Sequence, residues 1–439
     1  MLASLLMTAG GGAQAAEPVA PAALEPVANW YMTAPILGMT VGVTRPGEPP
    51  LIAAWGHLDA ARSVPAAPGT VYEIGSITKT FTAALVLRRV DQGRISLEDP
   101  ASRWLPELRQ AAPRVTIRHL LAHTSGLASN PVFEDLSRPV SANDLLRALR
   151  ERPVEFEPGA RFRYNNNGYA LLGLILEREA GLPYRAQLQR ELLGPLGLEN
   201  TEPCEFEDPD RPTGFDHGYR TAPRPVPHPR HHPDASGPAG LLCSTAGDLL
   251  RWQAALMGGA VLAPATLARM VEAQTLADGS ATPYGLGIYV DADGERLHHG
   301  GAVSGFITQM AWRPRDRMGV VVLTNGVYSG ALVERLEQDL GRVASGGSWA
   351  APLDLPVAAD DLEGLTGVYR IGDVGLEVFV VDGHLRARPD GQVATRLLHL
   401  GDGRFQAEHD PATTLTFLPN GDLLLERAGR ALPPGRRAP

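Results

Sequence analysis

Ser76 and Lys79 are a serine and a lysine three residues apart, and together they could form a nucleophile and its base. A serine hydroxyl attacks carbonyl groups well only when a base takes its proton. A spacing of three residues places both side chains on one face of a helix. Lys79 is the only lysine in the chain, and the other 39 of the 40 lysine and arginine residues are arginine. A buried ammonium can lose its proton near neutral pH, whereas a guanidinium cannot. The pair therefore predicts a serine hydrolase that works through an acyl-enzyme; the alternative is a surface lysine beside a helix-capping serine.

The segments around this pair predict how it is held. Apolar residues follow a helical spacing from Ile77 to Val90, and the pattern stops at Gly93. Ser76 would then lie in the first turn of a helix, where backbone N–H groups can stabilise a developing oxyanion. Met39–Thr44 and Leu51–Trp55 read as two strands joined by a turn rich in proline and glycine.

The remaining pattern predicts an α/β domain followed by a small all-β domain. Residues 1–16 resemble a signal peptide, 17–343 form the hydrolase domain, 344–360 have linker composition, and 361–439 form a small barrel-like β domain. Residues 17–35 read as a surface segment. Further helices are expected at Asn143–Arg150, Tyr169–Glu179, Leu249–Leu256 and Ala331–Val343, and further strands at Gly285–Val290, Phe306–Trp312, Met318–Thr324, Gly367–Arg370, Leu376–Val381, His384–Arg388, Arg404–Glu408, Thr414–Leu418 and Asp422–Leu425. Asp382-Gly383 and Asn420-Gly421 are expected to form hairpin turns in the β domain.

Glu73–Phe81 resembles the nucleophile segment of the serine β-lactamase and penicillin-binding protein superfamily, and in particular its class C β-lactamase, D-aminopeptidase and esterase branch. Other signatures of that branch follow in order over about residues 25–345: Leu120–Leu127, Tyr164–Asn166, Gly240–Leu249 and His299–Gly301. The resemblance implies a β-lactamase/transpeptidase-like fold, in which helices flank an antiparallel sheet and a helical subdomain is inserted. It also implies a D-amino-acid peptidase, a carboxypeptidase or an esterase.

The resemblance assigns roles to further residues. Tyr164 would relay the proton, drawn towards phenolate by two nearby positive groups. Asn166 would donate its amide to the substrate. Gly301 would let the substrate backbone approach closely, and the N–H groups of Ala302 and Ser76 would form the oxyanion hole.

His299-Gly300-Gly301 stands where β-lactamases of this superfamily carry K-T-G. A histidine is mostly neutral at pH 7, so it would hold a substrate carboxylate less firmly than a lysine. The departure favours a peptidase or esterase that acts on a small molecule, a short peptide or a peptidoglycan fragment. A class C-like β-lactamase and a non-catalytic cell-wall or ligand-binding protein on the same fold are the alternatives.

Three other motifs are interpreted as structural. His123–Leu127 is a structural element in this branch, and its Ser125 has no base nearby in sequence. Thr245–Asp248 has the pattern of a capped helix start. The histidines of His217–Pro233 lack zinc-site spacing, so a proline-rich loop at the cleft edge is expected there, and neither a metal nor another cofactor.

The composition excludes other classes of protein. A net charge of −9 provides no basic surface for nucleic acid. No apolar stretch reaches the roughly 20 residues that span a bilayer. Met1–Ala16 ends in the small residues that signal peptidase accepts, so a periplasmic or secreted protein is expected. Cys204 and Cys243 are expected to be buried free thiols, with a single bridge as the alternative.

Overall fold

The computed structural model describes most of the chain. The described residues are 19–34, 36–59, 61–128, 140–152, 154–204, 215–217, 225–227, 232, 237–303, 305–326, 330–390, 394–408, 410–427 and 430–438. Residues 1–16 and most of His217–Pro233 lie outside this description, so the signal-peptide and proline-loop expectations are not addressed by it.

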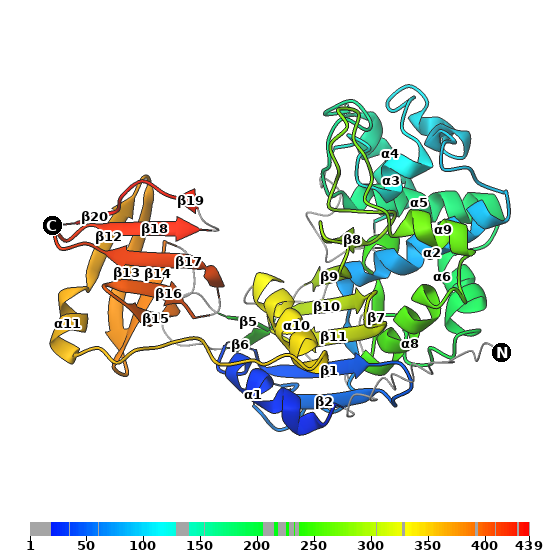
Figure 1. Cartoon of the computed structure of the whole chain (residues 1–439). Helices are drawn as coiled ribbons and strands as arrows, with labels where there is room; N and C mark the ends of the chain where they lie inside the picture. Colours follow the sequence, from blue (N-terminus) through cyan, green and yellow to red (C-terminus); the bar gives the residue numbers. More distant parts are fainter. Residues whose placement is uncertain are drawn as a thin grey trace, which may run out of the picture.

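A six-stranded antiparallel sheet forms the base of the larger domain, in the order β2-β1-β11-β10-β9-β8 (Figure 1). The strands are β1 (Gly38–Thr44), β2 (Leu51–Gly56), β8 (Tyr289–Val290), β9 (Leu297–Val303), β10 (Phe306–Arg313) and β11 (Met318–Thr324). The expected strand-turn-strand at the beginning of the chain and the hairpin of β10 and β11 are both confirmed. β1 pairs with β11, so the first strand of the domain lies beside the last.

Helices cover both faces of this sheet. Along β11, Met318, Val320 and Val322 pack in one core cluster with helices α1 (Pro21–Tyr31) and α10 (Gly330–Ala344). Val321 and Leu323, which point the other way, pack in a second cluster with α8 (Ala246–Met257). Because side chains alternate across a strand, an unbroken apolar run is what a strand covered on both faces requires.

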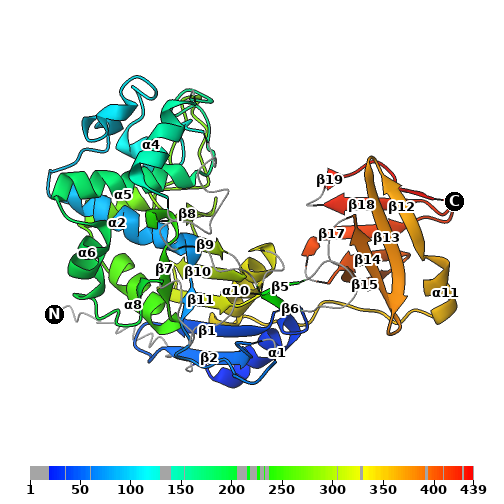
Figure 2. The same ribbon diagram turned by 180° about the vertical axis from the view of Figure 1, so that it is seen from behind.

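A helical subdomain rises above the sheet (Figures 1 and 2). Its helices are α2 (Thr78–Asp91), α3 (Ile117–Leu121), α4 (Ala142–Arg150), α5 (Asn166–Ala180), α6 (Tyr184–Leu188) and α9 (Pro264–Met270), with short turns η1 (Gly75–Ile77), η2 (Ala101–Arg103), η3 (Pro106–Leu108), η4 (Gln189–Leu193) and η5 (Gly237–Ala239). Short strands form two further small sheets: β3 (Tyr72–Glu73), β4 (Glu202–Pro203) and β7 (Leu242–Ser244) pair in one, and β5 (Phe215–His217) pairs with β6 (Pro225–Pro227) in the other. The architecture is the expected β-lactamase/transpeptidase-like α/β fold.

Two local expectations are wrong. Residues 17–35 do not form a surface segment, since α1 buries Leu24, Val27 and Tyr31 against the sheet. Gly285–Val290 is a strand only at Tyr289–Val290. Gly287 has a φ of 104° and lies so close to α2 that an added Cβ would be 2.3 Å from Cβ of Ala83. A close turn against a central helix replaces the expected strand.

The expectation of two free thiols is also wrong. Cys204 and Cys243 form a disulfide with an S–S distance of 2.02 Å, across 39 positions of sequence. β4 pairs with β7 so that Pro203 lies opposite Leu242. This pairing brings the two Cα atoms to 5.0 Å, within the range that a disulfide spans. The strand register, which is a long-range feature, decides the pairing.

The C-terminal region is an antiparallel β half-barrel of nine strands (Figure 2). Its elements are α11 (Ala359–Gly364), β12 (Gly367–Ile371), β13 (Val374–Val381), β14 (His384–Pro389), β15 (Thr395–Gly401), β16 (Arg404–Ala407), β17 (Asp410–Phe417), β18 (Leu423–Arg427), β19 (Arg430–Ala431) and β20 (Arg436–Arg437). The six expected strands are confirmed, and β15, β19 and β20 were not foreseen. Gly435 bridges to Leu423 of β18, while β20 pairs with β12, so the end of the chain links the two sides of the sheet.

Candidate active site

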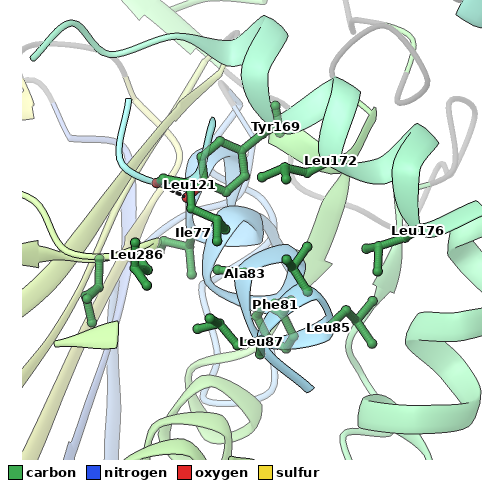
Figure 3. Packing of buried hydrophobic residues seen from close by; sticks show 14 of the residues in the cluster. Ile77, Phe81, Ala83, Leu85, Leu87, Leu121, Tyr169, Leu172, Leu176 and Leu286 are labelled. Atoms are coloured by element: carbon green, nitrogen blue, oxygen red, sulfur yellow. Dashed lines mark hydrogen bonds between the residues drawn. The ribbon is translucent and has the colours of Figure 1, made fainter. Parts of the chain in front are cut away.

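Ser76 lies in η1, immediately before the central helix α2. Residues 78–87 of α2 are all buried, and side chains of other elements such as Leu121, Leu172 and Leu286 surround it (Figure 3). Phe81 stacks on Trp252 with ring centroids 4.0 Å apart. A helix buried on all sides is held rigidly, so the turn that carries Ser76 has a fixed position.

Lys79 Nζ lies 3.0 Å from Ser76 Oγ and 2.7 Å from the carbonyl oxygen of Ala239. The lysine is fully buried, and among the described residues no carboxylate forms an ion pair with it. Burial lowers the pKa of Lys79 well below its ordinary value, because an ammonium loses its hydration there. A neutral amine donates to Ala239 and has a lone pair left for the serine proton. The structure thus brings together the two residues on which the sequence argument depends.

Tyr164 completes a contiguous set with this pair. Its hydroxyl is close enough to Ser76 for the two side chains to interact, and Lys79 Nζ lies 4.8 Å from its ring centroid. Burial raises the pKa of Tyr164 well above its ordinary value, and the interaction with Ser76 only partly opposes this. The expected drift towards phenolate is therefore wrong: with Lys79 neutral, no positive charge stabilises a phenolate, and the phenol keeps its proton.

Strand β9 packs directly against the serine turn. An added Cβ on Gly301 would lie 2.0 Å from the carbonyl oxygen of Ile74, and one on Gly75 would lie 3.1 Å from the backbone N of Ala302. Gly75 also has a φ of 49°, in the left-handed region that favours glycine. The hydroxyl of Thr308, on β10, donates to Ile74 at 3.1 Å. Two glycines therefore permit the close approach that puts Ala302 N–H beside the Ser76 turn.

The Tyr-Asn-Asn segment caps helix α5. Asn165 is the N-cap and accepts from the N–H of Gly168, while its Nδ2 donates to Leu127 at 2.7 Å. Asn167 Nδ2 donates to Ala128 at 2.8 Å. The buried Oδ1 atoms of Asn166 and Asn167 have no partner among the described residues. Asn167 is nevertheless held through its Nδ2, so Asn166 is the one of the three for which the structure records no side-chain hydrogen bond to the protein.

His299 faces the protein rather than an open pocket. The residue is 1% exposed, with Nδ1 2.7 Å from the carbonyl oxygen of Gly300 and Nε2 2.8 Å from the hydroxyl of Tyr284. Burial, followed by the proximity of Lys79, lowers the pKa of His299 to about 3. A carbonyl oxygen only accepts, so Nδ1 carries the single proton and Nε2 accepts from Tyr284. Both nitrogens are thus occupied, which differs from the substrate contact that the sequence suggested.

Aromatic rings that the sequence argument missed form the rest of the site. The hydroxyl of Tyr169 donates to Leu121 at 2.8 Å, and its ring centroid lies 5.5 Å from Lys79 Nζ. Tyr284 and Tyr289 contact each other edge to face at 4.6 Å. His123 lies against Tyr164 with ring centroids 4.2 Å apart. The only sequence feature that could have pointed to these rings is a tyrosine next to a glycine, such as Tyr284 before Gly285. That pattern by itself does not indicate a catalytic site.

Two of the other sequence motifs, those of Thr245 and Ser125, have the structural roles that were expected. Thr245 caps α8 by accepting from the N–H of Asp248, which confirms the capping pattern. Ser125 Oγ accepts from the N–H of Leu127 within its own loop. Across the described residues, no group of three or more histidine, cysteine, aspartate and glutamate side chains is arranged to hold a metal ion.

Residues 26–343 match the Beta-lactamase family. The chain belongs to this family. Esterase EstB of Burkholderia gladioli is 30% identical over 346 residues, which cover 67% of this chain and 87% of the esterase. Protein flp of Staphylococcus aureus (strain MW2) is 27% identical over 321 residues, 70% of this chain but only 63% of that relative's length. The chain therefore spans less than two thirds of the length of this relative.

Two solved structures share the fold of this beta-lactamase-family chain. The octameric penicillin-binding protein homologue from Pyrococcus abyssi has a TM-score of 0.68 at 23% identity, over 93% of this chain and 98% of that one. D-amino acid amidase from Ochrobactrum anthropi SV3, complexed with D-phenylalanine, has a TM-score of 0.67 at 21% identity, over 74% and 98% of the two chains. The first likeness extends over the C-terminal half-barrel as well. Within the described residues no helix is both long and apolar enough to cross a membrane.

Proposed function

We propose that this β-lactamase-family chain is a serine hydrolase that acylates Ser76 with esters or amides that lack a carboxylate. The observation that carries the proposal is the buried Lys79 amine, which lies 3.0 Å from Ser76 Oγ and forms no ion pair with a carboxylate among the described residues. A serine beside an amine that is neutral at working pH is an activated nucleophile.

The proposed acylation follows the hydrogen bonds of the site. Ser76 Oγ attacks the carbonyl carbon while its proton passes to Lys79 Nζ, and Ala239 O stabilises the new ammonium at 2.7 Å. The N–H groups of Ser76 and Ala302 would receive the oxyanion. Tyr164 then donates its hydroxyl proton to the leaving group and regains one from the Lys79 ammonium. In the second half, water attacks the acyl carbon and passes a proton to Lys79 Nζ. The bond from the acyl carbon to Ser76 Oγ then breaks, Lys79 returns the proton to Oγ, and the acid is released.

The charge around strand β9 supports substrates without a carboxylate. His299 has both nitrogens occupied and a pKa of about 3. His298 contacts Asp291 and Gln309, and burial lowers its pKa to about 2. Neither imidazole is cationic at neutral pH, so a substrate carboxylate at this strand would lose its hydration without a counter-charge. Simple esters and D-aminoacyl amides avoid that cost, in keeping with EstB's description as an esterase and the amidase's complex with D-phenylalanine.

The test is a substrate panel on wild type, Ser76→Ala and Lys79→Arg. It contains p-nitrophenyl esters, D-aminoacyl amides, a D-Ala-D-Ala peptide and nitrocefin. We expect hydrolysis of esters or amides that Ser76→Ala abolishes and Lys79→Arg lowers by at least about 100-fold, since a guanidinium cannot act as the base. Retained turnover in Lys79→Arg would contradict the role of the amine. Fast nitrocefin turnover would favour a class C-like β-lactamase, and failure of a fluorophosphonate to label Ser76 would favour a binding protein.

We further propose that the chain is exported to the periplasm or secreted. The Cys204–Cys243 bridge supports this, because disulfides persist mainly in oxidising compartments. Fractionation of cells that express the full chain, with a thiol-labelling assay of each fraction, tests it. Accumulation of the reduced protein in the cytoplasm alone would contradict export.

A further inference from the structure

His123 holds an unusual position beside the proposed catalytic residues. It follows helix α3, is 1% exposed and has a φ of 58°, a backbone conformation that few residues other than glycine adopt. Its ring lies among those of Tyr164, Tyr169 and Tyr284, at centroid distances of 4.2, 5.0 and 4.7 Å. The structural interpretation made from its sequence motif does not explain why a histidine is strained at this point.

Three contacts join His123 to Tyr164 and to both of its neighbours in the chain. The carbonyl oxygen of His123 accepts from the N–H of Arg163 at 2.8 Å. Its Nδ1 accepts from the N–H of Asn165 at 3.0 Å. Its ring lies against the Tyr164 ring with an angle of 34° between the planes. One residue therefore fixes the backbone on each side of Tyr164 and also one face of its ring.

The protonation of His123 excludes a role as a base. Nδ1 accepts a backbone hydrogen bond, so the proton of the neutral ring is on Nε2, which has no partner among the described residues. Burial, and then the nearby Lys79 and His299, lower the pKa of His123 well below its ordinary value. Its one lone pair is occupied and it stays uncharged at neutral pH. What remains is the control of Tyr164.

We infer that His123 is a positioning residue that aligns the Tyr164 hydroxyl with Ser76 and the leaving group. The inference rests on the proposed function, in which Tyr164 protonates the leaving group. Without His123, Tyr164 would retain Lys79 near its ring but lose the contact that orients its phenol. Substitution of His123 should therefore slow the proton transfer from Tyr164 to the leaving group and should not prevent folding.

The leaving group separates these two effects. An amide nitrogen must be protonated to leave, whereas p-nitrophenolate leaves without a proton. We expect His123→Asn, whose Oδ1 replaces Nδ1 as acceptor and which tolerates the left-handed backbone, to lower kcat on an amide by about tenfold or more. On the p-nitrophenyl ester of the same acyl group the loss should stay below about twofold. Rates are divided by the fraction of Ser76 that a fluorophosphonate titrates, so misfolded protein does not count.

His119→Asn is the matched control. His119 lies on α3, the helix that His123 follows; its Nδ1 accepts from the N–H of Thr116, and it has no ring contact with Tyr164 among the described residues. It should leave the ratio of amide to ester rates unchanged. Tyr164→Phe should reproduce the ratio of His123→Asn, and adding His123→Asn to Tyr164→Phe should change the ratio no further.

Equal losses of His123→Asn on both substrates would overturn the inference while Ser76→Ala still confirms the hydrolase. Activity that survives Ser76→Ala would instead overturn the proposed function. Should His123→Asn not fold, His123→Gly accepts the left-handed backbone and removes both the ring and the Nδ1 acceptor. It is then measured on the same pair of substrates, and an unchanged ratio of amide to ester rates overturns the inference.

Discussion

The hydroxyl of Tyr284 lies 2.8 Å from Nε2 of His299, so the histidine that aligns with a substrate-binding lysine is already bound to its own protein. Tyr284 is completely buried, and burial raises its pKa well above the ordinary value. It is therefore a permanent donor to that nitrogen at neutral pH. The position on β9 that would hold a substrate carboxylate is therefore uncharged, and neither nitrogen of its histidine is free.

We expect the enzyme to prefer acyl groups that lack a carboxylate over those that carry one. A p-nitrophenyl ester of succinate, which carries a terminal carboxylate, should show a kcat/KM at least about tenfold below that of its methyl-succinate counterpart, a difference of about 1.4 kcal/mol. The physical reason is the desolvation of a carboxylate beside neutral imidazoles. Equal values, or a preference for the carboxylate, would show that a cation reaches the site.

The pH dependence of activity should have an acidic limb and no alkaline limb below about pH 10. The base must be neutral, so kcat/KM rises with pH through the folded-state pKa of Lys79, which burial places well below 10.5. The acid must be protonated, and the raised pKa of Tyr164 keeps it so beyond the ordinary tyrosine pKa of 10.0. Steady-state rates from pH 5 to 10 on a non-ionising ester measure this. A rate that falls between pH 7 and 9 would contradict the assignment of the two groups.

Gly301→Ala should disable the site. The added methyl would lie 2.0 Å from the carbonyl oxygen of Ile74 and push β9 away from the serine turn. Because a displacement of about 1 Å can cost about 100-fold in rate, we expect a loss of that order in kcat. Gly69→Ala is the control, since nothing lies within 4 Å of its added Cβ and it should keep full activity. Normal rates in Gly301→Ala would show that the close approach is not required.

Loss of the disulfide should destabilise the folded chain. Replacing Cys204 and Cys243 together with alanine should lower the free energy of unfolding by about 4 kcal/mol, the chain-entropy effect for a loop of this length. Urea unfolding with and without dithiothreitol measures it. The reductant should weaken wild type and leave the double variant unchanged. Two titratable thiols in denatured, unreduced wild type would show that the bridge is absent.

Local sequence was sufficient for the nucleophile. Ser76 and Lys79 are one helical turn apart, so the period of the helix brings them together whatever the rest of the fold does. The strands β1, β2, β10 and β11 and the main helices were also predictable, because their apolar periodicity reflects burial of their own faces. Tyr164, Gly301 and Ala302 were identified only by resemblance to a family.

The tertiary structure decided which groups are charged and which are occupied. Cys204 pairs with Cys243 because β4 and β7 lie in register. His299 is neutral because burial removes water from its ring, and a turn carries Tyr284 to its Nε2. Tyr164 keeps its proton because the surrounding core removes water from it as well. Such contacts join residues that are tens to hundreds of positions apart and depend on burial. No period or spacing along the chain records them, because desolvation and hydrogen bonding belong to the packed molecule.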